Sequence, residues 1–237
     1  MQLWLCPVFA FLLGSIPFGL IIAKAKGIEI REHGSGNIGA TNVLRVIGKR
    51  YGFTCLFLDA LKGFIPVLIA VNLIQIAGRT IQIPVGFLDS WALVLPPAEA
   101  MNGQAVHVLT ALAAVLGHNY SPWVGFRGGK GVATSTGVLL ALMPFAVALL
   151  IIVFLLVFLV TRYVSLASIV AAAVLPMMTL WGSWHHGRIQ DGTWNVPLFL
   201  FSLLIAVLAI WKHRTNLQRL RAGTEHRFTR KAKTPHV

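Results

Sequence analysis

Long apolar stretches, each near the length of one membrane crossing, recur along this 237-residue chain. A helix needs about 20 mostly apolar residues to cross the hydrocarbon core of a bilayer. The stretches that meet or approach this length are Leu3–Ala23, Tyr51–Ala77, Ala105–Gly117, Val132–Val160, Leu166–Gly182 and Val196–Trp211. With 57% hydrophobic and 11% charged residues, the composition excludes an ordinary soluble enzyme, a disordered chain and a secreted disulfide scaffold. The sequence predicts an all-α polytopic integral membrane protein.

The stretch Val132–Val160 holds 29 residues without a charge and fits either one tilted helix or two short helices broken near Pro144. Basic residues concentrate in cytoplasmic loops, so their positions distinguish the two cases. Two helices place 17 of the 20 Lys and Arg residues on one side and leave only Arg79 and Arg188 opposite. We therefore predict seven transmembrane helices, an extracytoplasmic N-terminus and a cytoplasmic C-terminus. Each half of the broken stretch, about 13–16 residues, would need a thinner bilayer or shelter from its neighbours.

The net charge of +13 follows from this topology, so it does not indicate a nucleic-acid partner. Cys6 and Cys55 lie in or beside apolar stretches and are expected to be membrane-facing thiols. Residues 1–228 are predicted to form a single membrane-embedded domain, and residues 229–237 a basic cytoplasmic tail.

A glycine-rich polar segment, Gly34-Ser-Gly-Asn-Ile-Gly-Ala-Thr-Asn-Val-Leu-Arg45, lies in the first cytoplasmic loop. It fits the G-x-G-x-x-G dinucleotide pattern literally, but that pattern requires a βαβ unit that a membrane helix bundle does not supply. Glycines let backbone N–H groups face an anion, and arginine offers a planar fork to phosphate. The candidate substrate-binding residues are Ser35, Gly36, Asn37, Thr41, Asn42 and Arg45. The alternative is a flexible polar turn with a helix cap.

A second glycine-rich segment, Gly125-Phe-Arg-Gly-Gly-Lys-Gly-Val-Ala-Thr134, leads into an apolar stretch. It is not a Walker A loop, because the glycine spacing is too short and Gly131 follows the lysine where Ser or Thr is required. A lysine beside free N–H groups at a helix N-terminus still forms a good anion receptor. The candidates here are Gly128, Gly129, Lys130, Gly131 and Thr134. Two such loops on one membrane face predict a site for two phosphate groups.

A third polar segment, His213–Glu225, follows the last apolar stretch. His213 and Asn216 share a helical face, and histidine can act as a base near neutral pH. We assign these two residues to catalysis and Arg219 to substrate binding; the alternative is that His213 and Asn216 only cap the helix. Glu225, the only acid of this segment, is assigned to a structural ion pair.

Two further groups of polar residues are assigned no catalytic role. Asp59 and Lys62 lie three residues apart within an apolar stretch, so they are expected to neutralise each other as structural support. His186 and Asp191 have the His-x4-Asp spacing of a general-base dyad known from one class of enzyme, but they fall on the predicted extracytoplasmic side. No second ligand cluster lies near His185 and His186, so no metal site is predicted.

The three polar segments together resemble the signature motifs of the bacterial acyl-phosphate-dependent glycerol-3-phosphate acyltransferases, the PlsY family. The segments that match in order and spacing are 34–45, 125–134 and 213–225, together with Gly14–Gly19 and Arg162–Leu166. The resemblance covers Leu12–Phe228. Residues Gly78–Met101 and the tail after Phe228 look longer than a compact member needs, and no function is assigned to them.

The resemblance implies a seven-helix enzyme of the bacterial inner membrane, with its active site facing the cytoplasm. Such an enzyme transfers a fatty acyl group from acyl phosphate to the sn-1 hydroxyl of glycerol 3-phosphate, giving lysophosphatidate and inorganic phosphate. It needs no metal or cofactor. The implied partners are these two substrates, membrane lipid and an enzyme that produces acyl phosphate.

By the same resemblance, contacts to the substrate phosphates come from Ser35, Arg45 and the glycine loop with Lys130, and Ser165 is a further substrate-binding residue. His213 and Asn216 are needed for activity, and Glu225 for structural integrity. Either His213 or the substrate's own phosphate removes the hydroxyl proton. The rival class is a transporter of an organic phosphate, which predicts an inverted repeat and polar residues at mid-membrane. The sequence offers neither.

Overall fold

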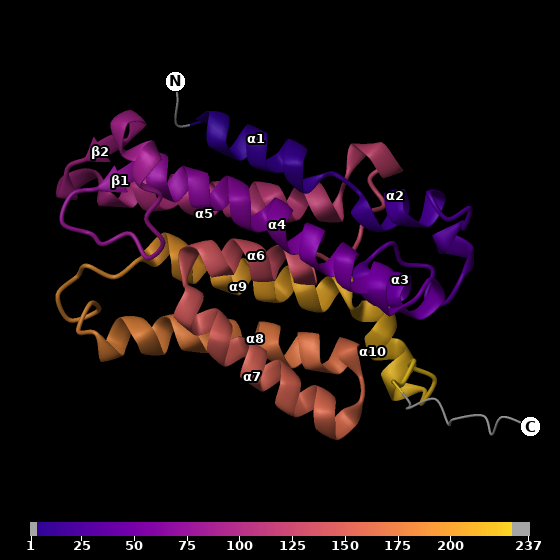
Figure 1. Ribbon diagram of the computed structural model, residues 1–237. Helices are drawn as coiled ribbons and strands as arrows, with labels where there is room; N and C mark the ends of the chain where they lie inside the picture. Colours follow the sequence, from indigo (N-terminus) through magenta and orange to yellow (C-terminus); the bar gives the residue numbers. More distant parts are fainter. Residues whose placement is uncertain (1–3, 229–237) are drawn as a thin grey trace, which may run out of the picture.

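The computed structural model describes residues 4–228 as a bundle of long helices that run back and forth between two ends (Figure 1). The α-helices are α1 Leu5–Gly14, α2 Phe18–Lys24, α3 Ala40–Val46, α4 Lys49–Leu73, α5 Ala100–Asn119, α6 Val132–Leu142, α7 Pro144–Thr161, α8 Val164–His185, α9 Val196–Lys212 and α10 Arg214–Arg221. Short 3-10 helices cover Ile30–Glu32, Gly86–Trp91, Pro97–Glu99 and Pro122–Val124. The strands β1 Ile74–Ile76 and β2 Leu93–Leu95 pair in parallel.

Within the described residues, five helical segments are long and apolar enough to cross a membrane: Leu5–Lys24, Lys49–Leu73, Pro97–Val124, Pro144–Thr161 and Val164–His185. Helices α9 and α10 qualify together as a sixth span that bends by 54° between them. Helix α6 is apolar but has only 11 residues. The mostly helical, multi-pass membrane architecture expected from the sequence is therefore confirmed.

The predicted break near Pro144 is confirmed, because α6 ends at Leu142 and α7 begins at the proline. A proline is tolerated in the first turn of a helix, where its missing N–H has no partner to lose. The prediction that the two halves have similar lengths is wrong. Helix α7 has 18 residues, since no helix breaker interrupts it before Thr161. The short α6 is sheltered by α4. Gly63 and Gly137 bring these two backbones so close that a side chain at either position would collide with a carbonyl of the other helix.

The outer surface of the bundle is apolar. Large side chains on α7, among them Phe145, Ile152, Leu156 and Val160, are exposed. The interior is built from smaller residues such as Ala10, Val67, Ala111, Ala114 and Val138. Small residues let membrane helices approach closely, and an apolar exterior suits lipid.

The all-α prediction is wrong in one detail, the two-stranded parallel sheet of β1 and β2. The predicted span Tyr51–Ala77 ends as a helix at Leu73. Beyond it, Ile74 and Ile76 are buried on one face of β1, and β-branched residues at alternate positions favour a strand. Ile76 and Leu95 lie beside Gly103 of α5, which leaves room for both side chains.

The expectation that Cys55 faces the membrane is also wrong. Cys55 is buried, with its Sγ 3.6 Å from Asp59 Oδ2 and beside Gly19 of α2. A free thiol is a small, largely apolar group that fits such a tight helix contact. Cys6 is partly buried, and both cysteines are free.

The basic loops gather at the end of the bundle that carries α3 and α10, on the right of Figure 1. There an Nη2 of Arg31 donates to the carbonyl of Arg127 at 3.0 Å, and the N–H of Phe228 donates to the carbonyl of Arg162 at 3.0 Å. Arg79 lies at the other end, near β1. The loops predicted to share one membrane face thus lie together, whereas the predicted tail, 229–237, falls outside the described residues.

Candidate active site

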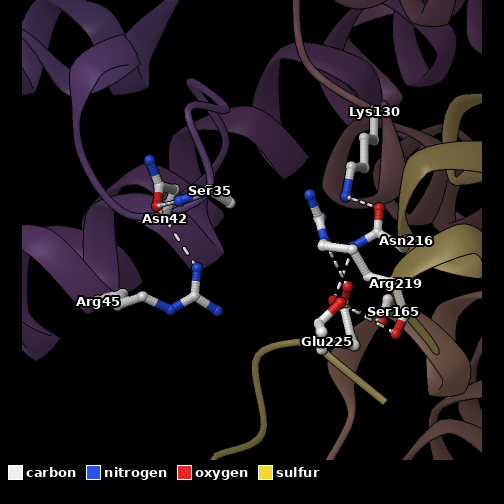
Figure 2. Close-up of polar contacts among 9 residues, drawn as sticks. Ser35, Asn42, Arg45, Lys130, Ser165, Asn216, Arg219 and Glu225 are labelled. Carbon is white, nitrogen blue, oxygen red and sulfur yellow. Dashed lines mark hydrogen bonds and ion pairs between the residues drawn. The ribbon is translucent and has the colours of Figure 1, made fainter. Parts of the chain in front are cut away.

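A cavity of about 350 Å³ lies at the α3–α10 end of the bundle. The sequence-predicted residues that line it are Ser35, Asn37, Thr41, Asn42, Arg45, Asp59, Lys130, Gly131, Ser165, His213, Asn216 and Glu225. Those that do not line it are Gly36, Lys62, Gly128, Gly129, Thr134 and Arg219. Figure 2 shows Ser35, Asn42 and Arg45 on one side, and Lys130 with Asn216 and Glu225 on the other. Three segments far apart in the sequence therefore build one site.

Asn42 holds the first glycine-rich loop in shape. Its amide nitrogen donates to the carbonyls of His33 at 3.0 Å and Asn37 at 2.9 Å, and its oxygen accepts from the N–H of Ser35 at 2.9 Å. Gly34 passes so close to this oxygen that any side chain there would collide with it. Asn42 is buried, so its main role is to fix the loop backbone rather than to reach a ligand.

Ser35 and Arg45 are two of the residues that this segment presents to the cavity, and Arg45 carries its positive charge. The Arg45 Nη1 lies 3.5 Å from Asn42 Oδ1, and its guanidinium lies 5.8 Å from the ring of Phe228. Within residues 4–228, Arg45 forms no ion pair. Partial burial lowers the pKa of Arg45; the nearby carboxylate of Glu225 raises it by a smaller amount, and the positive charge of Arg219 lowers it further. An unpaired, partly desolvated guanidinium is a strong receptor for phosphate.

The second glycine-rich loop is pressed against α5. Side chains at Gly128 or Gly129 would collide with the backbone or the ring of His118. Gly131 has a φ of 82°, and a Cβ there would lie 2.7 Å from Asn119 Oδ1. These glycines therefore allow the loop to pack closely against α5, which places Lys130 at the cavity. Thr134 is fully buried in α6, where its backbone meets Gly63 of α4.

Lys130 reaches across to the third segment. Its Nζ donates to Asn216 Oδ1 at 2.5 Å, and Asn216 Nδ2 donates to Glu225 Oε1 at 2.7 Å (Figure 2). The amide of Asn216 thus joins an ammonium to a carboxylate and aims the lysine at the cavity. Burial lowers the pKa of Lys130 to about 8.

Glu225 is the centre of a small polar cluster. Besides Asn216, it accepts from Arg219 Nε at 2.8 Å and from Ser165 Oγ at 3.0 Å. Partial burial opposes its ionisation, but these hydrogen bonds, the one from Arg219 first among them, hold the pKa of Glu225 below its usual range. The ion pair predicted for Glu225 is present, and its partner is Arg219. Arg219, assigned to substrate binding from the sequence, therefore has its charge neutralised here.

His213 lies at the bend between α9 and α10, and it is only 3% exposed. Its Nδ1 lies 2.8 Å from the carbonyl oxygen of Ala209. A carbonyl can only accept, so we assign the proton to Nδ1, which leaves Nε2 with a free lone pair. This tautomer suits a proton acceptor, because the cavity-lining imidazole keeps one basic nitrogen.

Asp59 and Lys62 form the predicted buried pair, with 2.7 Å between Oδ1 and Nζ. The Lys62 Nζ also donates to the carbonyl of Ile16 at 2.6 Å, which ties α4 to the break between α1 and α2. His118 completes this group, with its Nδ1 3.7 Å from Asp59 Oδ1. Both Asp59 and His118 line the cavity, and His118 was not predicted as a site residue. Its signal was its position directly after the apolar stretch Ala105–Gly117, a few residues before the second glycine-rich segment.

Most of the remaining wall of the cavity is apolar and was not predicted. It includes Phe53 and Leu56 of α4 and Phe154 and Phe158 of α7. Phe53 is 59% exposed and Leu56 45% exposed, so this wall continues into the outer apolar surface of the bundle. The site therefore joins a polar chamber to the lipid-facing side of the helices.

The histidine and aspartate that have the spacing of a general-base dyad lie away from this cavity. His186 and Asp191 follow α8 at the end of the bundle that carries β1, and neither lines the cavity. The ring of His185 instead packs against Trp181 at 5.1 Å. Among residues 4–228, no group of three or more His, Cys, Asp or Glu side chains could hold a metal ion.

Comparison with known proteins extends these observations over nearly the whole chain. A family model described as glycerol-3-phosphate acyltransferase matches residues 4–223. A glycerol-3-phosphate acyltransferase of Aquifex aeolicus is 43% identical over 221 residues, which are 93% of this chain and 96% of the relative. One of Geobacter metallireducens is 47% identical over 219 residues, covering 92% of this chain and 94% of the relative.

Two solved structures have a similar fold. One is a crystal structure of PlsY (YgiH), an integral membrane glycerol 3-phosphate acyltransferase, in its glycerol 3-phosphate form; the TM-score is 0.77 and the sequences are 40% identical. The other is the lysophosphatidic acid form, with a TM-score of 0.74 and 41% identity. Both alignments cover 97% of this chain and 96% of the other.

Proposed function

Because the chain belongs to the glycerol-3-phosphate acyltransferase family, we propose that it transfers a fatty acyl group from acyl phosphate to the sn-1 hydroxyl of glycerol 3-phosphate. The products are lysophosphatidate and inorganic phosphate. The observation that carries this proposal is the pairing of two cationic, glycine-rich loops with an apolar wall in one cavity. The cationic loops suit the phosphate groups of the two substrates, and the apolar wall suits the fatty acyl chain.

The same proposal includes seven membrane crossings, with the N-terminus outside and the site facing the cytoplasm of a bacterial inner membrane. Five long helices, the bent pair α9–α10 and the short α6 supply these crossings. The gathering of Arg31, Arg127 and Arg162 at the end that bears the cavity supports the orientation, because basic loops favour the cytoplasmic side.

Charge compensation is the main physical task of such a site. Two phosphates that carry two negative charges each form four repelling pairs of unit charges. At a separation of about 5 Å and an effective dielectric constant near 20, each pair costs about 3 kcal/mol, and the total repulsion is about 13 kcal/mol. Lys130 and Arg45 line the cavity with positive charge, and neither forms an ion pair within the described residues. These two cations offset the repulsion and let the two substrates approach.

The acyl-transfer step needs a hydroxyl oxygen that attacks the acyl carbon and an acceptor for the hydroxyl proton. The tetrahedral intermediate then collapses, breaking the bond to phosphate, which departs. His213 Nε2 is one candidate acceptor, because Nδ1 is already engaged with Ala209. A phosphate oxygen of a substrate is the other. The side-chain N–H groups of the cavity would stabilise the oxyanion of the tetrahedral intermediate. The acyl chain would lie along Phe53, Leu56 and Phe154, toward the lipid.

The test is a reaction of purified protein in detergent with palmitoyl phosphate and glycerol 3-phosphate, with and without EDTA. We expect lysophosphatidate acylated at sn-1 and inorganic phosphate in equal amounts, unaffected by the chelator. Palmitoyl-CoA in place of palmitoyl phosphate should give no product. Product from palmitoyl-CoA alone, or an isomer acylated at sn-2, would refute this donor or this regiochemistry. Phosphate-ester flux into sealed vesicles without any acylated product would point to a transporter instead.

The pH profile should report the ionisation of Lys130. Its pKa of about 8 means that the ammonium form, which binds phosphate, is lost as pH rises through this value. We expect kcat/KM to fall about tenfold per pH unit above the pKa. Lys130→Arg is the matched control, since arginine stays protonated and should remove this alkaline limb. An identical limb in wild type and Lys130→Arg would assign the titration to another group.

A substitution at the opposite end of the bundle should leave the reaction unchanged. His186→Ala lies outside the cavity lining and next to an exposed loop, so its kcat/KM should stay within about twofold of wild type. The same acylation assay measures it. A large loss would mean that the reaction depends on the end of the bundle that carries β1.

A further inference from the structure

A second cavity, of about 880 Å³, lies at the end of the bundle opposite the proposed active site. Its walls come from β1 and the residues after it, the first turns of α5 and the loop before α9. Its polar lining includes Arg79, Gln104, Arg188, Thr193 and Asn195. Among the described residues that line this cavity, none is an aspartate or a glutamate.

Two arginines give the cavity an uncompensated positive charge. Within residues 4–228, neither Arg79 nor Arg188 forms an ion pair with a carboxylate. Partial burial lowers the pKa of Arg79, and the nearby positive charge of Arg188 lowers it further. Two like charges near each other cost free energy that a bound anion would recover.

The guanidinium of Arg79 is held in place by neutral groups. Its Nη2 donates to the carbonyl of Thr193 at 2.9 Å. Gln104, only 3% exposed, faces it from α5. With the Gln104 amide assigned so that its oxygen accepts from Arg79 Nη2 at 2.9 Å, its nitrogen donates to Asn195 Oδ1 at 3.3 Å. Neutral partners fix the orientation of the fork without cancelling its charge, which prepares it to bind an anion.

The surroundings indicate the depth of this cavity in the membrane. Trp194 lines it, and Trp91 and Trp184 are 79% and 59% exposed at the same end of the bundle. Tryptophans concentrate at the level of lipid headgroups. Met101 and Leu198 add apolar surface to the lining. The cavity thus combines two cationic forks with apolar contacts at the depth where phosphate groups of lipids lie.

We propose that Arg79 and Arg188 form a second phosphate-binding site, separate from the active site, at this end of the bundle. A carboxylate has two oxygens, which one arginine fork satisfies, whereas a phosphate has enough oxygens for both forks. The ligand is a phosphate group, carried either by an anionic phospholipid or by a small soluble phosphate. The site does not depend on the identity of the acyl donor at the other end.

The experiment measures the thermal unfolding midpoint of the full-length protein in detergent while one ligand is titrated. One arm uses phosphatidylglycerol, with phosphatidylcholine for comparison, and the other uses inorganic phosphate. Both arms use the Lys130→Ala background, so that binding at the active site contributes little. The test variant adds Arg79→Gln and Arg188→Gln, and the matched control adds Arg50→Gln, an exposed arginine at the other end of the bundle.

The titration gives an apparent dissociation constant for phosphatidylglycerol. If the paired substitution raises this constant at least about tenfold and Arg50→Gln does not, the site binds a lipid headgroup. The same pattern with inorganic phosphate would identify a soluble ligand. Equal stabilisation of the test and control variants in both arms, or none in either, would overturn the proposal. Acylation activity of the paired variant with Lys130 intact shows that it folds. Arg188→Glu is a second variant, a single substitution at an exposed position that should not disturb folding, and it should also weaken binding because it reverses a charge that would face the phosphate.

Discussion

Replacing Lys130 by alanine should lower kcat/KM for acyl transfer by roughly 10²–10³-fold. Lys130 donates to Asn216 and lines the cavity, where it forms no ion pair within the described residues. Losing a charge-assisted contact to a desolvated phosphate costs roughly 2–5 kcal/mol, and each 1.4 kcal/mol is tenfold. Initial rates of lysophosphatidate formation, with each substrate varied in turn, measure the effect.

Lys130→Arg is the matched control for charge. It should keep more activity than the alanine variant, because the positive charge remains although its shape changes. A Lys130→Ala enzyme with kcat/KM within about threefold of wild type would show that this ammonium does not contact a reacting phosphate.

Replacing Arg45 by alanine should raise the KM for one of the two phosphate substrates by roughly 100-fold. Its guanidinium faces the cavity and has no carboxylate partner among the described residues. A bidentate arginine–phosphate contact in a partly buried site contributes about 2–3 kcal/mol. Steady-state kinetics with acyl phosphate and glycerol 3-phosphate varied separately would identify which phosphate it binds.

Arg221→Ala provides the comparison, because Arg221 is exposed at the same end of the bundle and does not line the cavity. Its KM values should match wild type. Equal effects of Arg45→Ala and Arg221→Ala would mean that only the general positive field of this face matters. An unchanged KM for both substrates in Arg45→Ala would remove this residue from the site.

Hydropathy and charge bias were sufficient to predict the membrane bundle, because lipid requires apolar helices of a set length. The break at Pro144 could be predicted from the distribution of basic residues. The unequal lengths of α6 and α7 could not, since the shelter of the short α6 depends on the close packing of Gly63 against Thr134 and of Gly137 against Ala60. The strand β1 was missed for a related reason: Ile74 and Ile76 look like the end of an apolar span.

In the site, the sequence identified the three polar segments but not how their side chains pair. Lys130 meets Asn216 because α10 leaves α9 at a bend of 54°. Arg219 meets Glu225 because the chain turns back after α10 at Gly223, which has a φ of 69°. No residue pattern specifies the angle of the bend. His118 was missed because a histidine within an apolar run is equally compatible with a core position.

The apolar wall escaped prediction because hydropathy does not distinguish a side chain that faces lipid from one that lines a cavity. Phe53 does both, since it lines the cavity and is 59% exposed. Such residues become recognisable only when the helices are placed together in three dimensions.

The most direct test is the sidedness of the two glycine-rich loops, because the account requires them to share one cavity at one membrane face. Single cysteines would be introduced as Glu32→Cys, Arg127→Cys and Asp191→Cys in a protein lacking Cys6 and Cys55; all three target positions are exposed. A membrane-impermeant maleimide should label the first two only in inverted vesicles and the third only in right-side-out vesicles. Labelling of positions 32 and 127 from opposite sides of the membrane would contradict the account.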